Sequence, residues 1–203
     1  MDHKLLLATN NQAKVREYRS LLQNIAFELV TLAEEGITTT VSEVGESLEE
    51  NARLKATVLA AQSQLLALGD DSGLEVDALG GEPGRLSARY AGQGASDKDR
   101  VNYLLSRLKG VPWQERSARF RCIIAIATPG GEVELCRGEC RGFITFEPRG
   151  EQGFGYDPVF YLPELDKTMA ELPLEIKNQV SHRGQAARKV YQVLERQPFS
   201  AFS

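Results

Sequence analysis

Two adjacent acidic residues, Asp70 and Asp71, stand between two apolar stretches of the chain. Carboxylates beside a sheet core are costly unless they are paired or bind a cation, and hard oxygen ligands of this kind suit Mg²⁺. A plain turn closed by an Asx hydrogen bond explains the same residues about equally well. If the segment is extended instead, alternation would point the two side chains in opposite directions, so that only one of them can be central to a site.

A second polar cluster covers residues 9–14, where an apolar strand is expected to give way to a helix. Backbone N–H groups at a helix start, hydroxyl and amide donors, and Lys14 one turn later could bind phosphate oxygens. The Gly-rich spacing of a Walker A loop is missing. An N-cap followed by a surface lysine accounts for the same residues, so the cluster alone does not establish a phosphate site.

Acidic residues gather again at the expected start of a long helix. Ser47 and Glu50 have the spacing of a capping box, and carboxylates near a helix start favour its dipole. This explanation leaves Glu43 outside the helix without a role. It also leaves Asn51 and Lys55 four residues apart on one face, away from the apolar stripe that we expect to face the core.

A fourth cluster lies towards the C-terminus, in the segment Gly-Phe-Gly-Tyr-Asp-Pro at residues 153–158 and in residues 177–184. Glycines on both sides of Phe154 would let a flat base approach and stack, and charged side chains nearby would supply directional polar contacts. The alternatives are core packing for Phe154 and a solvated helix start for His182 and Arg183.

Apolar patterns predict the elements that must position these clusters. Strands are expected at residues 4–8, 27–32, 66–70, 74–79, 118–127, 133–141 and 142–146. Helices are expected after residues 10–11, over 46–66, from about residue 96 and near the C-terminus, with apolar stripes at Val15, Tyr18, Leu21 and Leu22, at Leu54, Val58, Ala61 and Leu65, at Val101, Leu104, Leu105 and Leu108, and at Ala187, Val190, Tyr191 and Leu194. This mixture predicts an α/β fold with a mixed sheet.

The composition is that of a globular protein. Of 203 residues, 42% are hydrophobic and 26% are charged, which is enough for residues 1–203 to bury a full core as one domain or as two small lobes. The net charge of -4 argues against a general nucleic-acid surface. The apolar stretch near the N-terminus is too short for a signal-peptide core, and no run approaches the roughly 20 residues of a spanning helix. We therefore expect a cytoplasmic protein that binds neither membranes nor nucleic acid.

The cysteines do not indicate a disulfide framework. Cys136 and Cys140 fall in one expected strand, where a rise of roughly 3.3 Å per residue separates them by about 13 Å, too far for a bridge. Cys122 leaves the number odd, and the two histidines of the chain make a zinc site a poor alternative. Buried free thiols in a reducing compartment are the expectation.

Taken together, these motifs resemble those of the inosine/xanthosine triphosphate pyrophosphatases, from Leu5 to Leu194. The matching segments lie at residues 8–14, 43–45, 50–52, 55–56, 70–74, 81–84, 87–90, 153–158, 177 and 181–184. Two departures are Asn10, where the family usually has Gly, and Val44, where Thr is common. The first could reshape the phosphate loop slightly.

The resemblance implies an α/β fold with an elongated mixed β-sheet, flanking helices and two lobes around a central nucleotide cleft. It implies a homodimer that uses Mg²⁺ and cleaves ITP, dITP and XTP to the monophosphate and pyrophosphate. Glu43 and Asp71 would bind Mg²⁺, and Asp71 would orient or deprotonate the attacking water. The triphosphate site would comprise Thr9, Asn10, Asn11, Gln12, Ala13, Lys14 and Lys55, and the base and sugar site Ser72, Phe154, Gly155, Tyr156, Asp157, Lys177, His182 and Arg183.

The donor inventory of Arg183 suggests how the base could be chosen. A guanidinium offers only donors, so it can bond the O6 carbonyl of hypoxanthine or xanthine but meets another donor in the 6-amino group of adenine. Guanine also carries O6, so exclusion of GTP would have to come from its 2-amino group meeting a wall near Phe154 and Asp157.

Three other functions remain open at this stage. A related pyrophosphatase acting on pyrimidine or other modified nucleotides would keep the phosphate residues and differ around the base. A nucleotide-binding sensor without turnover would have lost an acid or a lysine of the site, and none of the matching positions is lost. A nucleic-acid-binding module is disfavoured by the acidic balance and by the lack of a basic aromatic stripe.

Overall fold

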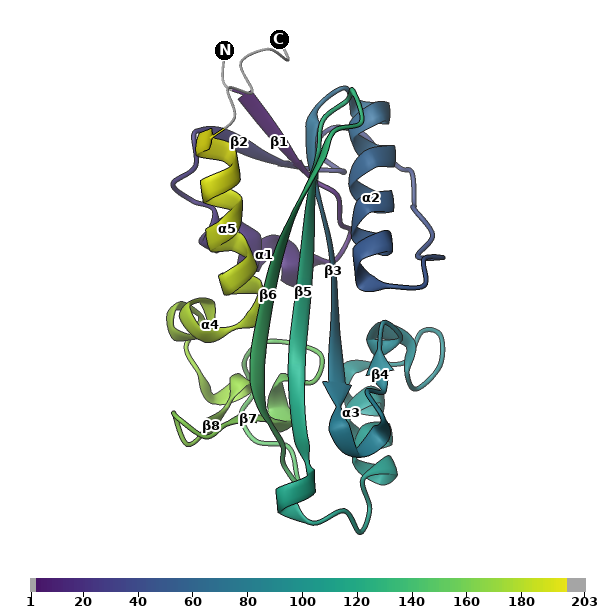
Figure 1. The fold of residues 1–203 in the computed structure, drawn as a ribbon, viewed down its shortest axis with the longest axis vertical. Coiled ribbons are helices and arrows are strands. Elements are labelled where there is room, and N and C mark those ends of the chain that lie inside the picture. The colour runs from purple at the N-terminus through teal and green to yellow at the C-terminus, as the bar shows by residue number, and fades with distance from the viewer. Residues whose placement is uncertain (1–2, 197–203) are drawn as a thin grey trace. The chain divides into compact units, whose positions relative to one another are not determined.

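A computed structural model describes residues 3–196 of the chain, in two compact units (Figure 1). Within these residues, unit 1 comprises 3–71, 122–138 and 183–196, and unit 2 comprises 72–121 and 139–182. The chain passes from one unit to the other inside three long strands and again between His182 and Arg183. The predicted α/β class and mixed sheet are confirmed.

The strands form one mixed sheet in the order β2-β1-β3-β5-β6-β7-β8, with β4 beside β3. Strand β1 is parallel to β2 and β3, whereas β3 with β4, β6 with β7 and β7 with β8 are antiparallel. The strands are β1 (His3–Leu7), β2 (Phe27–Thr31), β3 (Leu66–Val76), β4 (Pro83–Gly84), β5 (Ser117–Ala127), β6 (Val133–Ile144), β7 (Phe160–Leu162) and β8 (Lys167–Thr168).

Three of the five α-helices among the described residues begin near the starts that the sequence predicts. The α-helices are α1 (Gln12–Leu21), α2 (Leu48–Ser63), α3 (Asp97–Arg107), α4 (Leu174–Val180) and α5 (His182–Arg196). Asn11 caps α1, Ser47 caps α2 and Ser96 caps α3, each through its side-chain oxygen. Short 3₁₀ turns lie at Asp77–Leu79, Ser87–Arg89, Trp113–Glu115, Asp157–Val159 and Met169–Glu171.

In unit 1, helices cover both faces of the sheet. Alternation along β1 sends Leu5 and Leu7 into one apolar cluster with residues of α1 and α5, and sends Leu6 into another with residues of α2. Figure 1 shows α1 and α5 on one side of this part of the sheet and α2 on the other. The predicted stripes of α1 and α5 are confirmed, because all their members are buried or packed against the first cluster.

The predicted core stripe of α2 is wrong. Val58 is 38% exposed, and the buried face instead carries Leu48, Asn51, Ala52, Lys55, Ala56, Leu59 and Ala60. The reason is a close approach to β3 at Gly69, where an added Cβ would lie 2.7 Å from backbone atoms of Ala52 and Ala56. Helix and strand backbones pack directly against each other there, so small residues face the core, and Asn51 and Lys55 lie on the same side.

Strand β3 is a second correction. Two short strands at 66–70 and 74–79 were predicted on either side of a possible turn, and the structure instead has one continuous strand from Leu66 to Val76. Asp70 and Asp71 remain in extended backbone because nearby cations and an amide compensate their buried carboxylates. The expected strands at 133–141 and 142–146 likewise form one strand, β6.

Unit 2 has its own core. Val101, Leu104 and Leu108 from α3 and its C-cap pack with Phe120 of β5 and Phe160 of β7. Helix α3 starts with a complete capping box, in which Ser96 and Asp99 exchange hydrogen bonds. The helix predicted from about residue 96 is therefore confirmed.

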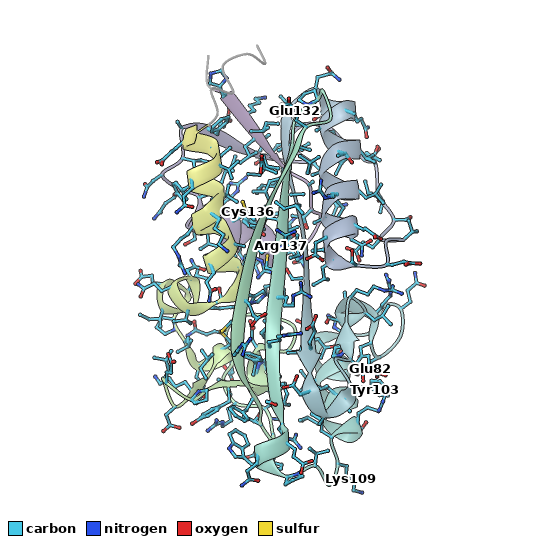
Figure 2. The ribbon with its side chains drawn as sticks, in the orientation of Figure 1. Glu82, Tyr103, Lys109, Glu132, Cys136 and Arg137 are labelled. Atoms are coloured by element: carbon cyan, nitrogen blue, oxygen red, sulfur yellow. The ribbon has the colours of Figure 1, made fainter. Side chains whose placement is uncertain are left out.

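All three cysteines are buried free thiols, as predicted. Cys136 lies on β6 (Figure 2). Burial raises the pKa of Cys136 to about 11 and that of Cys140 to about 12, so both remain protonated at neutral pH. Among residues 3–196, no helix has the length and apolar character that crossing a bilayer requires.

Candidate active site

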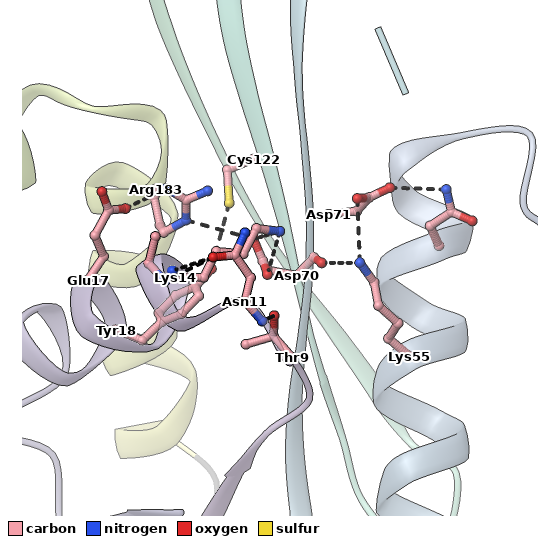
Figure 3. Close-up of polar contacts among 12 residues, drawn as sticks. Thr9, Asn11, Lys14, Glu17, Tyr18, Lys55, Asp70, Asp71, Cys122 and Arg183 are labelled. Carbon is pink, nitrogen blue, oxygen red and sulfur yellow. Dashed lines mark hydrogen bonds and ion pairs between the residues drawn. The ribbon is translucent and has the colours of Figure 1, made fainter. Parts of the chain in front are cut away.

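Strand β3 separates the side chains of Asp70 and Asp71 (Figure 3). Asp70 meets Lys14 from α1, whereas Asp71 meets Asn51 and Lys55 from α2. Both carboxylates are buried, at 1% and 5% exposure. The alternation predicted for an extended segment is therefore confirmed, and the Asx turn is wrong. The two aspartates and the residues around them all lie in unit 1: Lys14, Glu43, Asn51, Lys55, Asp70 and Asp71.

On the Asp71 side, oxygen atoms converge on one ammonium group. Lys55 Nζ lies 3.0 Å from Glu43 Oε1 and 3.4 Å from Asp71 Oδ1, and it also donates to the backbone carbonyl of Asp70. Asn51 Nδ2 donates to the second oxygen of Asp71 at 3.0 Å. Asn51 also accepts from Gly45 N at 2.8 Å, which fixes the segment that carries Glu43.

The charges on this side are incompletely balanced. Burial raises the pKa of Asp71, and the Glu43 carboxylate raises it further, against the opposing effects of Lys55 and Lys14. Burial would lower the pKa of Lys55, but Asp71, Asp70 and Glu43 outweigh it and hold this pKa above its usual value. Lys55 therefore stays charged, while the anionic form of Asp71 is less favoured than that of an exposed aspartate.

On the Asp70 side, the carboxylate is fully compensated. Lys14 Nζ lies 3.0 Å from each carboxylate oxygen, and Arg183 Nε lies 3.8 Å from Oδ2. Burial would raise the pKa of Asp70, but the charges of Lys14, Arg183 and Lys55 hold it well below its usual range. Arg183 itself is 2% exposed and forms an ion pair of 2.5 Å with Glu17 of α1.

The segment at residues 9–14 makes a capped helix start. Asn11 Oδ1 accepts from the backbone N–H groups of Ala13 and Lys14 at 2.9 and 3.2 Å, and Thr9 Oγ1 accepts from Asn11 N at 3.2 Å. Asn10, Asn11 and Gln12 are exposed. The N-cap interpretation is thus correct, but its surface lysine is not, because Lys14 reaches the buried Asp70.

A divalent cation fits the Asp71 side. Within residues 3–196, no three His, Cys, Asp or Glu side chains are grouped as a metal cage. Mg²⁺ does not require one, since it commonly binds through one or two carboxylates together with substrate phosphates and waters. Glu43 and Asp71 provide two such carboxylates around a position that already holds a positive charge.

In unit 2, the loop Gly153–Asp157 is held by hydrogen bonds to the side chain of its last residue, Asp157. Asp157 Oδ2 accepts from Phe154 N at 2.9 Å and from Lys177 Nζ at 2.5 Å. Gly153 has φ +78°, and an added Cβ would collide with the Asp157 carboxylate and approach Lys177 Nζ to 3.0 Å. Only glycine fits this position.

The side chains around this loop have two different roles. Lys177 contacts the Phe154 ring, and the hydroxyl of Tyr156 supports the loop. Lys177 Nζ lies 5.1 Å from the centroid of the half-buried Phe154 ring, a cation–π contact. Tyr156 is buried and donates to the carbonyl of Ser87 at 2.8 Å, so its hydroxyl supports the loop. His182 stacks on Phe120 with centroids 4.7 Å apart. The solvated helix start considered for His182 and Arg183 is wrong, because both are buried.

The structure thus groups the predicted site residues within each unit. In unit 1, Lys14, Lys55, Glu43, Asp71 and Arg183 join one network through Asp70. In unit 2, Phe154, Gly155, Tyr156, Asp157 and Lys177 form the loop cluster, while Ser72 follows Asp71 in β3.

Two contributors carried no assigned role in the sequence. Glu17 lies one turn after Lys14 and next to the apolar stripe of α1. This placement is the sequence feature that could have indicated its role. Asn51 shares a face with Lys55, and that face is the buried one.

Similar proteins are known across nearly the whole chain. The model of the Ham1 family matches residues 5–193. A dITP/XTP pyrophosphatase from Bacillus subtilis is 45% identical over 94% of this chain and 96% of its own length. Proteins of the same name from Desulforamulus reducens and Geobacter sulfurreducens are 50% and 51% identical, over 95% and 90% of this chain and 96% and 92% of their own lengths.

Solved structures agree in fold. A Ham1 protein from Coxiella burnetii has a TM-score of 0.87 at 39% identity and covers 96% of this chain and 100% of its own. The Ham1 protein of Staphylococcus aureus has a TM-score of 0.84 at 40% identity, over 95% and 98% of the two chains.

Proposed function

Because this chain belongs to the Ham1 family, we propose that it hydrolyses the triphosphates of aberrant 6-oxo purines to the monophosphate and pyrophosphate. Relatives of similar length are named dITP/XTP pyrophosphatases, so dITP, ITP and XTP are the proposed substrates. The observation that carries the proposal is the convergence of Glu43, Asp71 and the Asp70 carbonyl on Lys55 Nζ. In this arrangement Lys55 would supply positive charge to the phosphate chain of the substrate. Asp71 would supply a carboxylate for the attacking water.

The charge balance supports a reaction that needs a metal ion. The contacts around β3 involve three cations, Lys14, Lys55 and Arg183, and four carboxylates, Glu17, Glu43, Asp70 and Asp71. Such a set has a formal charge of -1 and would repel a triphosphate unless a further cation accompanies it. Mg²⁺ held by Glu43 and Asp71 would supply Lewis-acid charge to the phosphate oxygens.

The chain's own residues supply the remaining chemistry. Asp71 orients the attacking water and accepts its proton, while Asn51 Nδ2 holds the second oxygen of its carboxylate at 3.0 Å. The water oxygen bonds to the α-phosphorus while the bond to the bridging oxygen breaks, and pyrophosphate leaves. Lys14 and Lys55 offset the charge that builds on the phosphate oxygens, and the segment Thr9–Ala13 adds hydroxyl and amide donors.

Unit 2 supplies the proposed nucleoside site. The half-buried Phe154 offers a ring face, and Asp157 with Lys177 offers a fixed pair of charged groups beside it. Ser72 and His182 complete the proposed set. Arg183 is proposed to donate to O6 of the base, and Glu17 fixes the orientation of its guanidinium.

Homodimerisation and a cytoplasmic location are also part of the proposal, and the family resemblance supports them. A dimer would elute in size-exclusion chromatography with light scattering at about twice the chain mass of 22.4 kDa. A mass equal to one chain at micromolar concentration would contradict it.

A substrate panel tests the proposed function. Pyrophosphate release is measured with dITP, XTP, dATP, dGTP and dTTP in the presence of Mg²⁺. We expect dITP and XTP to be hydrolysed at least roughly 100-fold more efficiently than dATP, because a donor facing the 6-amino group loses its hydrogen bond. Equal efficiency on dTTP would favour the alternative of a pyrophosphatase for other modified nucleotides. Binding of dITP without any turnover would favour a sensor.

A further inference from the structure

The Gly153–Asp157 loop has a second anchor outside the residues of the proposed site. Gly155 N donates to Asp97 Oδ2 at 2.7 Å. Asp97 is the first residue of α3, and its other carboxylate oxygen is bound by Arg100. Gly155 has φ +64°, a backbone conformation that glycine adopts without strain.

Arg100 fixes this carboxylate from the opposite side. Its Nη1 donates to the carbonyls of Ala88 and Ala95 at 3.0 and 2.6 Å, and its Nη2 holds Asp97. The side chain of Arg100 is 18% exposed, so little of it is available to solvent. Asp97 is therefore held between the segment at 88–95 and the Gly153–Asp157 loop.

A parallel contact ties the same loop to the same segment. Tyr156 OH donates to the carbonyl of Ser87 at 2.8 Å, and Ser87 Oγ accepts from Leu74 N at 2.9 Å and donates to the carbonyl of Gly84 at 2.6 Å. Successive loop residues thus have separate anchors: Gly155 bonds to the first residue of α3, and Tyr156 bonds to Ser87 between β4 and α3. The motif at residues 81–90, which had no assigned role, forms part of this support.

We propose that Asp97 is a positioning residue for nucleoside binding, which sets the Gly153–Asp157 loop so that Phe154 and Lys177 meet the base and sugar. This inference rests on the proposed function of that loop. Charge-assisted bonds to backbone N–H groups are among the stronger hydrogen bonds, and misplacing a binding group by about 1 Å can cost up to roughly 100-fold in catalysis. Asp97 acts through the loop and therefore affects affinity more than turnover.

Asp99 provides a matched control. It is also an acid in the first turn of α3, but it bonds Ser96 in the capping box. Asp99→Ala therefore weakens the start of the helix, whereas Asp97→Ala releases the loop. Asp97→Asn keeps an oxygen that can accept from Gly155 N while losing the charge.

The test combines kinetics with hydrogen exchange. For Asp97→Ala we expect KM for dITP to rise about tenfold, with kcat within about threefold of the parent, a partial return in Asp97→Asn, and near-parental values in Asp99→Ala. Exchange of the peptide covering residues 153–157, measured without nucleotide, should accelerate in Asp97→Ala and stay near the parental rate in Asp99→Ala. An unchanged KM in Asp97→Ala would overturn the inference, as would an equal rise in Asp99→Ala or unchanged exchange. Loss of dITP turnover in the parent would instead refute the proposed function, and the exchange data would still decide whether Asp97 holds the loop.

Discussion

The two faces of β3 place the same residue type, aspartate, in different electrostatic surroundings. Asp70 is surrounded by Lys14, Arg183 and Lys55, which together lower its pKa despite complete burial. Asp71, the next residue, has a raised pKa because burial and Glu43 outweigh Lys55 and the Asn51 amide. One carboxylate is stabilised as an anion, whereas the anionic form of the other is disfavoured. We propose on this basis that Asp70 organises the fold of unit 1 and that Asp71 carries the chemistry.

The largest expected effect is on turnover in Asp71→Asn. The amide cannot accept a proton from water and is a weaker metal ligand, so kcat for dITP should fall by roughly 100-fold or more. Because burial disfavours the Asp71 anion, the free energy of unfolding should stay the same or increase. Steady-state kinetics measures kcat, and denaturant unfolding at pH 7 measures the free energy of unfolding. Parental kcat in Asp71→Asn would remove this residue from the mechanism.

A change of base choice is the next largest expected effect. In Arg183→Lys, the positive charge near Glu17 and Asp70 is kept, but the planar fork of donors is lost. We expect the ratio of kcat/KM for dITP over dATP to narrow by roughly tenfold, with the metal dependence intact. Arg19→Lys is the control, since Arg19 forms an exposed pair with Glu34. An unchanged ratio would mean that Arg183 has only a structural role, like the role proposed for Asp70.

Asp70→Asn tests that structural role directly. The folded pKa of Asp70 lies below its unfolded value, so its ionised form stabilises the fold at neutral pH and this contribution is lost as pH falls through the folded pKa. Removing one partner of a buried charge cluster costs about 3–5 kcal/mol, and we expect a loss of this order in denaturant unfolding at pH 7. The fall in kcat should be smaller than in Asp71→Asn. The reverse order in kcat would break the comparison.

The smallest expected effect is thermal stabilisation by the metal. Mg²⁺ with pyrophosphate should raise the Tm by a few degrees, since a ligand that binds only the folded state stabilises it. Glu43→Gln should lose this shift because it removes a proposed metal ligand, whereas Asp70→Asn should keep most of it. A full shift in Glu43→Gln would place the metal elsewhere.

Much of this arrangement could be predicted from sequence because it depends on local spacing. Residue type and period predict a cap at Asn10 or Asn11, a helix that starts near Ser96, and opposite directions for Asp70 and Asp71 in an extended segment. The core face of α2 could not be predicted, because its alanines face the core only where Gly69 lets the two backbones meet.

Long-range partners were equally inaccessible from local pattern. Nothing near Asp70 in the sequence indicates Lys14, which is 56 residues away, or Arg183. Without those partners, two adjacent acids favour a turn as readily as a strand, and the continuity of β3 could not be foreseen. The role proposed for Asp97 depends on Gly155, 58 residues later.

The most direct test of the central claim is to follow dITP and its products by ³¹P NMR with Mg²⁺ and with excess EDTA. We predict dIMP and pyrophosphate as the first products with Mg²⁺, and no turnover in EDTA, because Glu43 and Asp71 are the proposed ligands of the cation. Inorganic phosphate as the first product, or undiminished turnover in EDTA, would contradict the account.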